Sequence, residues 1–301
     1  MSNLAPVALF TYNRPDHTKR TIEALVRNRL SADTDLLIFS DAAKNATQQN
    51  MVDAVRAFIH SIKGFKSLTI IERESNLGLA ASIIDGVTTV INARGKVIVL
   101  EDDMVTSPYF LQYMNDGLTK YAEYQDVASI HAYVYPISGL PETFFLRGAD
   151  CWGWATWEDR WAWFEPDGSK LLAQLTVLDL LKKFDFNGNY SFSDMLRAQI
   201  TGSNNSWAIR WHASTFLLNK LTLYPGKSLL RNIGNDGSGV HCGQTDSYSS
   251  QLRDEPLILG AIPLSESEQA FRQFEKFFKK NKVSRLRRLL RKVNVSFKKF
   301  L

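Results

Sequence analysis

Residues 96–103 are Lys96-Val97-Ile98-Val99-Leu100-Glu101-Asp102-Asp103, an apolar run that ends in three consecutive acids. The unbroken apolar run predicts a strand covered on both faces, as in a parallel sheet. Open α/β sheets bind ligands in the crevice beyond the carboxyl ends of their strands, where these acids would lie. Carboxylates this close repel one another unless a cation lies among them, and hard divalent cations prefer oxygen ligands. The stretch therefore predicts a metal ion that holds a diphosphate.

Outward from this stretch, the first 130 residues alternate between strand and helix patterns. Strands are expected at 6–11, 36–39, 67–71 and 96–100, and helices at about 16–28, 48–61, 79–92 and 108–124. Asp16 is expected to cap the first helix. Strands that alternate with helices of this length pair in parallel, so the sequence predicts an α/β sandwich.

The composition is that of an ordinary soluble enzyme. With 301 residues the chain can bury a sizeable core, as one large domain or two smaller ones. We expect no membrane-spanning segment, because no apolar run reaches about eighteen residues, and no signal peptide. The two cysteines, Cys151 and Cys242, form no CxxC pair. A reducing cytoplasm is therefore expected rather than a secreted disulfide framework.

Positive charge is concentrated at the C-terminal end. Residues 271–301 contain twelve Lys or Arg and one acid, a net charge of +11, so the rest of a chain with net charge +5 carries −6. An aromatic stripe with helical spacing runs through this segment: Phe271, Phe274, Phe277 and Phe278. The pattern predicts a helix lying on the anionic inner face of the cytoplasmic membrane. Nucleic-acid binding is the disfavoured rival, and a solvated tail is the plain alternative.

Five segments, in order, resemble the nucleotide-sugar glycosyltransferases of the GT-A fold. They are Leu9-Phe10-Thr11-Tyr12-Asn13-Arg14-Pro15, Phe39-Ser40-Asp41, Asn76-Leu77-Gly78-Leu79-Ala80, Leu100-Glu101-Asp102-Asp103-Met104 and Cys151-Trp152-Gly153-Trp154-Ala155-Thr156-Trp157. The acidic segment is similar to that of N-acetylglucosaminyltransferase I, and the whole pattern more to bacterial enzymes that build lipopolysaccharide, O-antigen or capsule. The resemblance implies a Rossmann-like GT-A domain over 1–265, with a basic helical tail over 266–301.

The resemblance also assigns a metal site. It implies that Asp103 contacts a Mn²⁺ or Mg²⁺ ion that bridges the donor's two phosphates, while Glu101 and Asp102 orient the ion's water or bind the donor's ribose and sugar. By position alone, an acidic cap on the helix near Pro108 is the alternative. His241, in a glycine-rich loop, is a further metal ligand or phosphate contact, with a structural histidine as the alternative.

Three more residues are implied in donor binding. Asp41 would accept the imide N–H of uracil, which favours a UDP-sugar. Arg14 would offer a cationic fork to phosphate oxygens. Asn76 opens a turn into a helix whose N-terminus favours the diphosphate. The plain alternatives are a loop-capping carboxylate, a solvated arginine and an ordinary helix start.

Five of the seven tryptophans lie between residues 152 and 163. Indole rings pack in cores, and they also stack on the C–H faces of sugars. In the GT-A family this segment lines the donor-sugar and acceptor side of the site. We expect Trp152 or Trp154 to touch a sugar, and Trp157, Trp161 and Trp163 to be mainly core.

An inverting transferase needs a carboxylate that takes the proton of the acceptor hydroxyl. In a segment that resembles the family, the position where an acid can precede Ser-Trp is Asn205, which cannot serve as a base. Asp194 is the first candidate base, with a helix N-cap as the alternative. Asp236 is the second, with turn formation as the alternative.

Together these features predict a metal-dependent, inverting glycosyltransferase. It would move a hexose or N-acetylhexosamine from a nucleotide-sugar to a glycan or lipid-linked acceptor in bacterial surface polysaccharide synthesis. The enzymatic rival is a nucleotidyltransferase that makes nucleotide-sugars, but the glycine-rich loop expected there is replaced by Tyr12-Asn13-Arg14-Pro15. The non-enzymatic rival is a sugar- or nucleic-acid-binding module.

Overall fold

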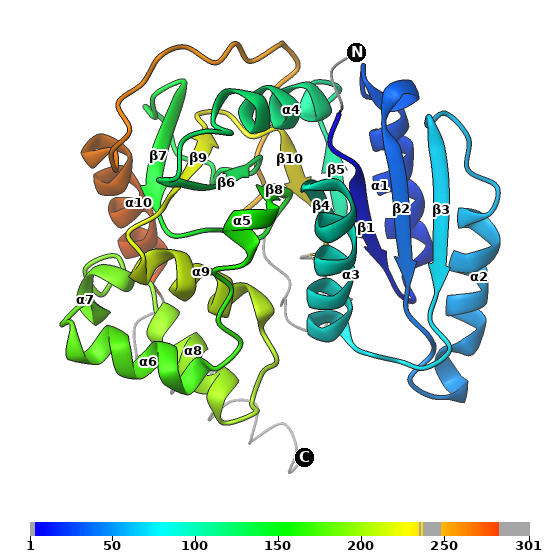
Figure 1. Ribbon diagram of the computed structural model, residues 1–301, viewed down its shortest axis with the longest axis horizontal. Helices are drawn as coiled ribbons and strands as arrows, with labels where there is room; N and C mark the ends of the chain where they lie inside the picture. The colour runs from blue at the N-terminus through cyan, green and yellow to red at the C-terminus, as the bar shows by residue number, and fades with distance from the viewer. Residues whose placement is uncertain (1–3, 235, 237–247, 283–301) are drawn as a thin grey trace, which may run out of the picture.

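The computed structural model describes residues 4–234, 236 and 248–282. Its centre is an eight-stranded mixed sheet with helices on both faces (Figure 1). The strands are β1 Val7–Thr11, β2 Asp35–Ser40, β3 Ser67–Glu72, β4 Lys96–Glu101, β5 Met104–Thr106, β6 Val127–His131, β7 Thr143–Arg147, β8 Trp154–Trp157, β9 Leu221–Pro225 and β10 Leu230–Asn232. The helices are α1 Pro15–Val26, α2 Gln49–Ile59, α3 Leu79–Arg94, α4 Phe110–Lys120, α5 Glu158–Trp161, α6 Gly168–Val177, α7 Leu181–Phe184, α8 Phe192–Ile200, α9 Trp207–Leu217 and α10 Glu268–Asn281, with short 3₁₀ helices at Ser31–Asp33 and Ala46–Gln48.

The first half of the chain follows the predicted alternation of strands and helices. The strand order is β3-β2-β1-β4-β8-β6-β9-β7, and β1 pairs in parallel with both β2 and β4. The order 3-2-1-4 is that of a Rossmann-like domain, so the predicted α/β fold class is confirmed. One detail was wrong: Arg14 is the N-cap residue of α1, and Asp16 lies within its first turn after Pro15.

Both faces of the sheet are covered because successive side chains of each strand point to opposite sides. Val7 and Leu9 of β1 belong to one core, together with residues of α1, α2 and α4. Ala8 and Phe10 belong to a second core on the other face, with residues of α3 and α9. Because both faces of the sheet are covered by apolar side chains, polar side chains are placed at the ends of the strands.

The second half of the sheet brings further strand ends to the same edge. β8 is antiparallel to both β4 and β6, so β6 runs in the same direction as β4, and β9 is parallel to β6. The carboxyl ends of β1, β4 and β6 therefore lie at one edge. At this edge β5, which directly follows the acidic triplet, pairs with β10 in a separate two-stranded ribbon.

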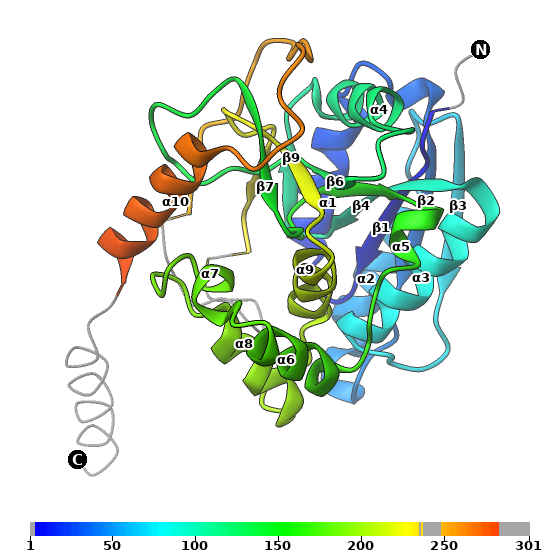
Figure 2. The same ribbon diagram turned by 60° about the vertical axis from the view of Figure 1, so that its left-hand side comes forward.

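Helix α10 packs its aromatic face onto the domain beside β7 (Figure 2). Phe274 and Phe278 are buried, and Phe271 and Phe277 are half-buried in the same hydrophobic cluster. The rings of Phe277 and Tyr135 are 5.3 Å apart. The prediction that this aromatic stripe faces a membrane is therefore wrong, because the four rings complete a core of the domain.

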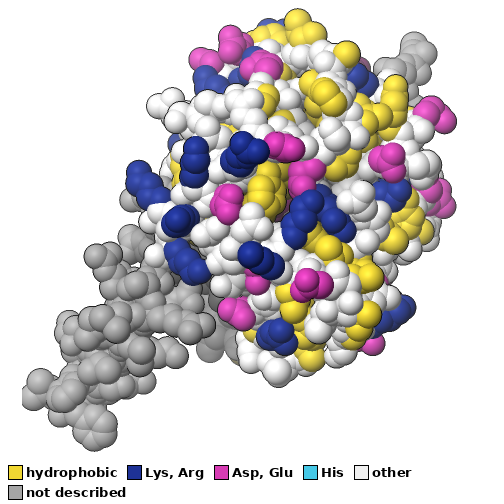
Figure 3. Space-filling view, turned by 90° about the vertical axis from the view of Figure 1, so that its left-hand side faces the viewer, with side chains coloured by type: hydrophobic (Ala, Val, Ile, Leu, Met, Phe, Trp, Pro, Cys, Tyr) yellow, Lys and Arg dark blue, Asp and Glu magenta, His cyan; other side chains and the backbone are white. Residues whose placement is uncertain are grey.

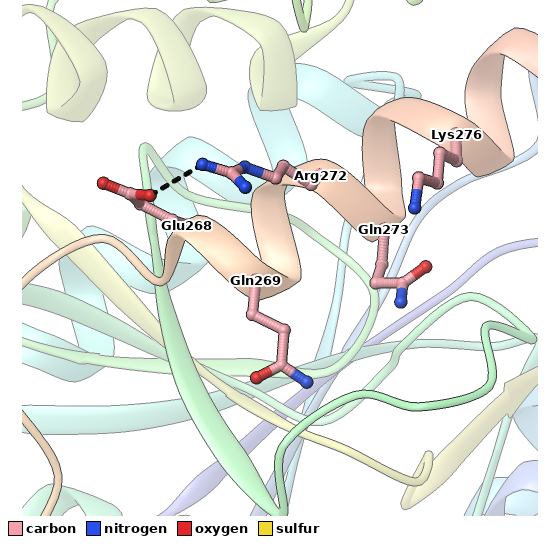
Figure 4. Close-up of a pocket in the computed structure, with 5 residues that line it drawn as sticks. All are labelled: Glu268, Gln269, Arg272, Gln273 and Lys276. Atoms are coloured by element: carbon pink, nitrogen blue, oxygen red, sulfur yellow. Dashed lines mark hydrogen bonds and ion pairs between the residues drawn. The ribbon is translucent and has the colours of Figure 1, made fainter.

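The other face of α10 is polar, and Lys and Arg side chains gather on this side of the molecule (Figure 3). A hollow there is lined by Glu268, Gln269, Arg272, Gln273 and Lys276 (Figure 4). Arg272 pairs with Glu268 at 3.0 Å, so part of this charge is neutralised locally. Within the described residues, no helix has the length and apolar character needed to cross a bilayer. The basic stretch 283–301 lies outside the described residues.

Candidate active site

The acidic triplet lies where β4 ends and the chain turns into β5. Glu101 is the last residue of β4, and Asp102 and Asp103 are buried, with exposed fractions of 3% and 7%. The backbone oxygen of Asp102 accepts a hydrogen bond of 2.8 Å from Thr21 Oγ1 of α1. Helix α4 begins at Phe110 and has no side-chain cap. The triplet thus belongs to the carboxyl edge of the sheet, and the helix-cap alternative is wrong.

Arg14, at the start of α1, pairs with both aspartates. Its Nη2 donates hydrogen bonds to Oδ1 of Asp102 and to Oδ2 of Asp103, the latter at 2.9 Å. Burial lowers the pKa of the guanidinium, but the two carboxylates outweigh burial and raise it overall, so Arg14 stays charged. The solvated-arginine alternative is therefore wrong. Any phosphate that Arg14 contacts would share its charge with the two acids.

Three acids and one arginine leave an excess of negative charge. Burial raises the pKa of Glu101, and the charges of Asp103 and Asp102 raise it further, while Arg14 offsets part of the effect. Burial also raises the pKa of Asp102 against the opposing effect of Arg14. In both cases the ionised form lacks water and sufficient counter-charge. An additional cation at this edge would stabilise both carboxylates.

Asp103 has an oxygen atom to offer such a cation. Its Oδ1 is buried and has no hydrogen-bond partner in the part of the chain that the structure describes, whereas Oδ2 is held by Arg14. Its backbone oxygen accepts a hydrogen bond of 2.8 Å from the amide of Ile233, which holds the chain after β10 against the acid. A Cβ atom on Gly234 would lie 2.1 Å from Asp103 Oδ2. A glycine is needed at this position because any side chain would collide with the carboxylate.

The donor set fits a metal ion that shares its coordination with a substrate. Among residues 4–234, 236 and 248–282, no group of three or more His, Cys, Asp or Glu side chains is arranged to hold a metal by itself. Mg²⁺ at nucleotide sites is typically held by one or two carboxylates together with phosphate oxygens. Within the described residues, the unpaired Oδ1 of Asp103 can supply one such carboxylate ligand, which is all that an ion shared with a diphosphate needs from the protein.

His17 is a residue of this site that the sequence reasoning missed. Its Nε2 lies 3.1 Å from Oδ2 of Asp236, and its charge, when protonated, would act on Asp102. Asp236 thus lies beside α1, and its role as a base stays a prediction. The signal was present, because His17 follows Arg14 by three residues and shares its face of α1.

Asp41 follows β2, but its carboxylate holds the next loop together. Oδ1 accepts hydrogen bonds from the amides of Ala42 and Leu77, both at 2.9 Å. Oδ2 accepts from the amide of Gly78 at 2.9 Å and from Asn76 Nδ2 at 3.0 Å. Both Asp41 and Asn76 therefore anchor the turn before α3, as the plain alternatives had it. A contact from Asp41 to uracil stays a prediction and would have to replace one of these bonds.

The two tryptophans expected at the sugar differ in exposure. Trp152 is half-buried and packs edge-on against Tyr133, with ring centroids 4.7 Å apart. Trp154 is 0% exposed and stacks on Trp207 at 5.4 Å. A sugar contact for Trp154 is therefore wrong, because its ring fills the core under α3. The other tryptophans of the run are core residues, as predicted: Trp157, Trp161 and the partly buried Trp163.

Asp194 is not brought together with the triplet. It is exposed in the first turn of α8, where Ser191 is the N-cap residue, so the N-cap alternative is wrong, and a role as base stays a prediction. Its charge acts on Asp185, whose Oδ1 accepts a hydrogen bond of 2.7 Å from the amide of Ser193. His241 lies outside the described residues, and its role as a metal ligand stays a prediction.

Comparison with known proteins does not identify a family. No family model matches the chain, and no curated protein matches it. Among solved structures, it is similar to S. aureus TarS, with a TM-score of 0.33 and 14% identity, over 49% of this chain and 25% of that one. It is also similar to UDP-glucose pyrophosphorylase complexed with UDP-glucose, with a TM-score of 0.39 and 12% identity, over 76% of this chain and 94% of that one. The chain thus spans about a quarter of TarS, and similarity at this level leaves function to be inferred from the site.

Proposed function

We propose that the protein is a metal-dependent glycosyltransferase that uses a nucleotide-sugar donor. The observation that carries this proposal is the buried Oδ1 of Asp103 at the carboxyl edge of the sheet, which has no hydrogen-bond partner among the described residues. The raised pKa of Glu101 and the close approach of the Gly234 backbone to Asp103 support a cation shared with a diphosphate. The Tyr12-Asn13-Arg14-Pro15 turn favours a transferase over a nucleotidyltransferase, which would need a glycine-rich loop there.

In this proposal Asp103 holds Mn²⁺ or Mg²⁺ together with the donor's diphosphate. The bound ion would supply positive charge at the leaving group. Arg14 keeps the two aspartates in position, and Glu101 with Asp102 orients water or the donor's ribose. His241 is a further proposed ligand.

The donor is proposed to be a UDP-sugar, with Asp41 near the base, the turn at Asn76 near the diphosphate and Trp152 against a sugar ring. Trp152 suits this role because its ring is only half-buried. The acceptor is proposed to be a glycan or a lipid-linked sugar of a bacterial surface polysaccharide, and the transfer to be inverting.

A peripheral position on the inner face of the cytoplasmic membrane is part of the same proposal. Since the phenylalanines of α10 pack into the domain, the attraction would rest on the basic residues of the tail, at about 1 kcal/mol each near an anionic surface. Sedimentation with anionic and with neutral vesicles, for the full chain and for residues 1–282, tests it. Equal sedimentation of both proteins with anionic vesicles would exclude the tail as the anchor.

Thermal unfolding with nucleotides tests the proposed function. A ligand present at 100 times its Kd stabilises the native state by about 2.7 kcal/mol, which raises Tm by several degrees. We expect such a rise with UDP or a UDP-sugar only when Mn²⁺ is present, and its loss in Asp103→Asn. Asp254→Asn, at a side chain that is 90% exposed, is the matched control. No metal-dependent rise with any nucleoside diphosphate or nucleotide-sugar would contradict the proposal.

A further inference from the structure

Asp150 is a carboxylate at the same edge of the sheet as the triplet, and no role has been assigned to it above. It belongs to the segment between β7 and β8. Trp154, the first residue of β8, pairs with Val99 of β4 on one side and with His131 of β6 on the other. Because neighbouring strands lie about 4.8 Å apart, β4 and β6 are roughly 10 Å apart here. Asp150 lies beside the end of β6, where its Oδ2 is 3.7 Å from Nε2 of His131.

The backbone on both sides of Asp150 is held by glycines that cannot be replaced without a clash. Gly148 has φ +91°, and a Cβ there would lie 2.5 Å from Cε1 of His212. Gly153 has φ +65°, and a Cβ there would lie 2.3 Å from Cδ1 of Leu230. Left-handed backbone pressed against buried side chains gives the segment one conformation. Asp150 is thereby presented from a fixed position, as a reacting group requires.

The carboxyl group of Asp150 is partly open to solvent. Its side chain is 28% exposed, and Oδ1 accepts a hydrogen bond of 2.8 Å from the amide of Cys151. His131 is fully buried, its two ring nitrogens have no hydrogen-bond partner within the described residues, and burial lowers its pKa to about 4 although Asp150 opposes the shift. The imidazole is therefore neutral at pH 7 and does not neutralise Asp150. In the described part of the chain, no Lys or Arg forms an ion pair with Asp150.

Several tyrosine rings lie close enough to Asp150 for its charge to act on their hydroxyl groups. Trp152 packs on Tyr133 with centroids 4.7 Å apart, and Tyr133 on Tyr135 at 5.2 Å. Tyr135 in turn packs on Tyr248 at 5.5 Å. Burial, with a contribution from the nearby charge of Asp150, raises the pKa of Tyr133 and of Tyr135, so both phenols stay neutral. Trp152, two residues after Asp150, is half-buried, and an indole ring near a carboxyl group can bind a sugar, whose C–H face stacks on the ring while a hydroxyl contacts the acid.

We propose that Asp150 takes the proton of the acceptor hydroxyl, on a sugar-binding surface that includes Trp152. The inference rests on the proposed glycosyl transfer and names its base and its acceptor surface. Asp236 is less suited, since it already pairs with His17 at 3.1 Å beside the triplet. Asp194 is less suited because it lies on the exposed side of α8.

The proposed step balances without a further reactant. A lone pair of the acceptor oxygen forms the new bond to the anomeric carbon of the donor sugar. The bond from that carbon to the diphosphate oxygen breaks, and its electron pair leaves with the nucleoside diphosphate. The acceptor's hydroxyl proton moves to Oδ2 of Asp150, which later releases it to water.

The test uses the full chain as wild type, Asp150→Asn and Asp150→Ala, with exposed Asp254→Asn as the control. Binding of UDP with Mn²⁺ is measured by calorimetry. UDP release is measured from UDP-glucose, UDP-galactose and UDP-N-acetylglucosamine, with water and with methyl glycosides of these sugars as acceptors. Sodium formate is added to Asp150→Ala, since formate can occupy the space of the lost carboxylate. Melting temperatures show whether each variant is folded.

We expect Asp150→Asn to bind UDP within twofold of wild type and to release it at least 100-fold more slowly, the usual contribution of a general base. Formate should restore release in Asp150→Ala, which a merely structural role would not allow. The inference is overturned, and the proposed function stands, if wild type releases UDP and Asp150→Asn releases it equally fast. The same holds if wild type releases UDP and Asp150→Asn no longer binds UDP. A wild type that binds UDP but releases none from any donor overturns the inference as well. A wild type that binds no UDP in the presence of Mn²⁺ overturns both.

Discussion

His131 should make the stability of the protein depend on pH in acid. Its ring is fully buried, and burial lowers its pKa from the ordinary 6.5 to about 4, with the charge of Asp150 opposing the shift. The same imidazole in the unfolded chain takes up its proton near pH 6.5. Between pH 6.5 and 4 the unfolded chain therefore binds more protons than the folded one, so acid favours unfolding.

The magnitude follows from the interval between the two pKa values of His131. About 2.5 pH units, at 1.36 kcal/mol each, correspond to about 3 kcal/mol of stability that is present above pH 6.5 and lost as the pH falls through 4. About 2 kcal/mol of it is lost by pH 5. The rings packed on His131, Tyr133 and Tyr224, have raised pKa values because of burial and stay neutral throughout. The hydroxyl of Tyr113 donates a hydrogen bond to the backbone oxygen of His131 and does not contact the imidazole ring through this bond.

The assay is urea unfolding of wild type and His131→Phe at pH 7, 6, 5 and 4 and constant ionic strength. Phenylalanine fills the ring's place without a titrating group, so the stability of the variant relative to wild type should rise by about 2 kcal/mol by pH 5 and about 3 kcal/mol by pH 4. Tyr224→Phe is the control, since it changes the neighbouring ring, 5.0 Å away, without removing a group that titrates in this range. A constant difference between His131→Phe and wild type at every pH would refute the reasoning.

Four further substitutions test the packing around the site, each by urea unfolding at pH 7. Gly234→Ala puts a Cβ 2.1 Å from Asp103 Oδ2, so it should lower the free energy of unfolding by about 1–3 kcal/mol and abolish the Mn²⁺-dependent rise in Tm with UDP. Gly260→Ala is the control: a Cβ there has no atom within 4 Å, so the change should be neutral or slightly stabilising. Equal effects of the two substitutions would refute the close approach. Trp154→Ala should cost about 3–5 kcal/mol because it empties a fully buried site, and a loss below about 1 kcal/mol would contradict the core role. Phe274→Ala should also lower the free energy of unfolding by about 3–5 kcal/mol if α10 belongs to the domain. A stability close to that of wild type would mean that α10 is not part of the domain core. Asp41→Ala leaves four donors without their acceptor and should cost about 3 kcal/mol, and an unchanged stability would mean that the turn before α3 does not depend on it.

Much of the fold was predictable because its signals are local. The apolar runs of β1 to β4 and the intervening helical stripes lie within short windows, and each window carries its own periodicity. The acidic triplet was predictable for the same reason, since it directly follows β4. The register of β8 between β4 and β6 was not, because it joins residues far apart in the chain.

The errors at the site share one physical origin. Whether a tryptophan is core or surface depends on what lies over it, and Trp154 is covered by α3 and α9 from distant parts of the chain. The phenylalanines of α10 had the spacing of a membrane helix, and an amphipathic stripe has the same spacing whether a lipid surface or a protein core covers it. Asp41 could have faced a ligand, yet the backbone amides that follow Asn76 fold back onto it.

The sequence by itself determined the α/β alternation and put three acids at the end of a buried strand, because strand and helix periods and the order of residues along a strand are local properties. Only the tertiary structure decided which partners those acids have. Arg14 meets Asp102 across 88 residues of sequence, Gly234 closes on Asp103, and Asp150 reaches the same edge through β8. Such contacts depend on sheet order and register, and these follow from the packing of the whole chain.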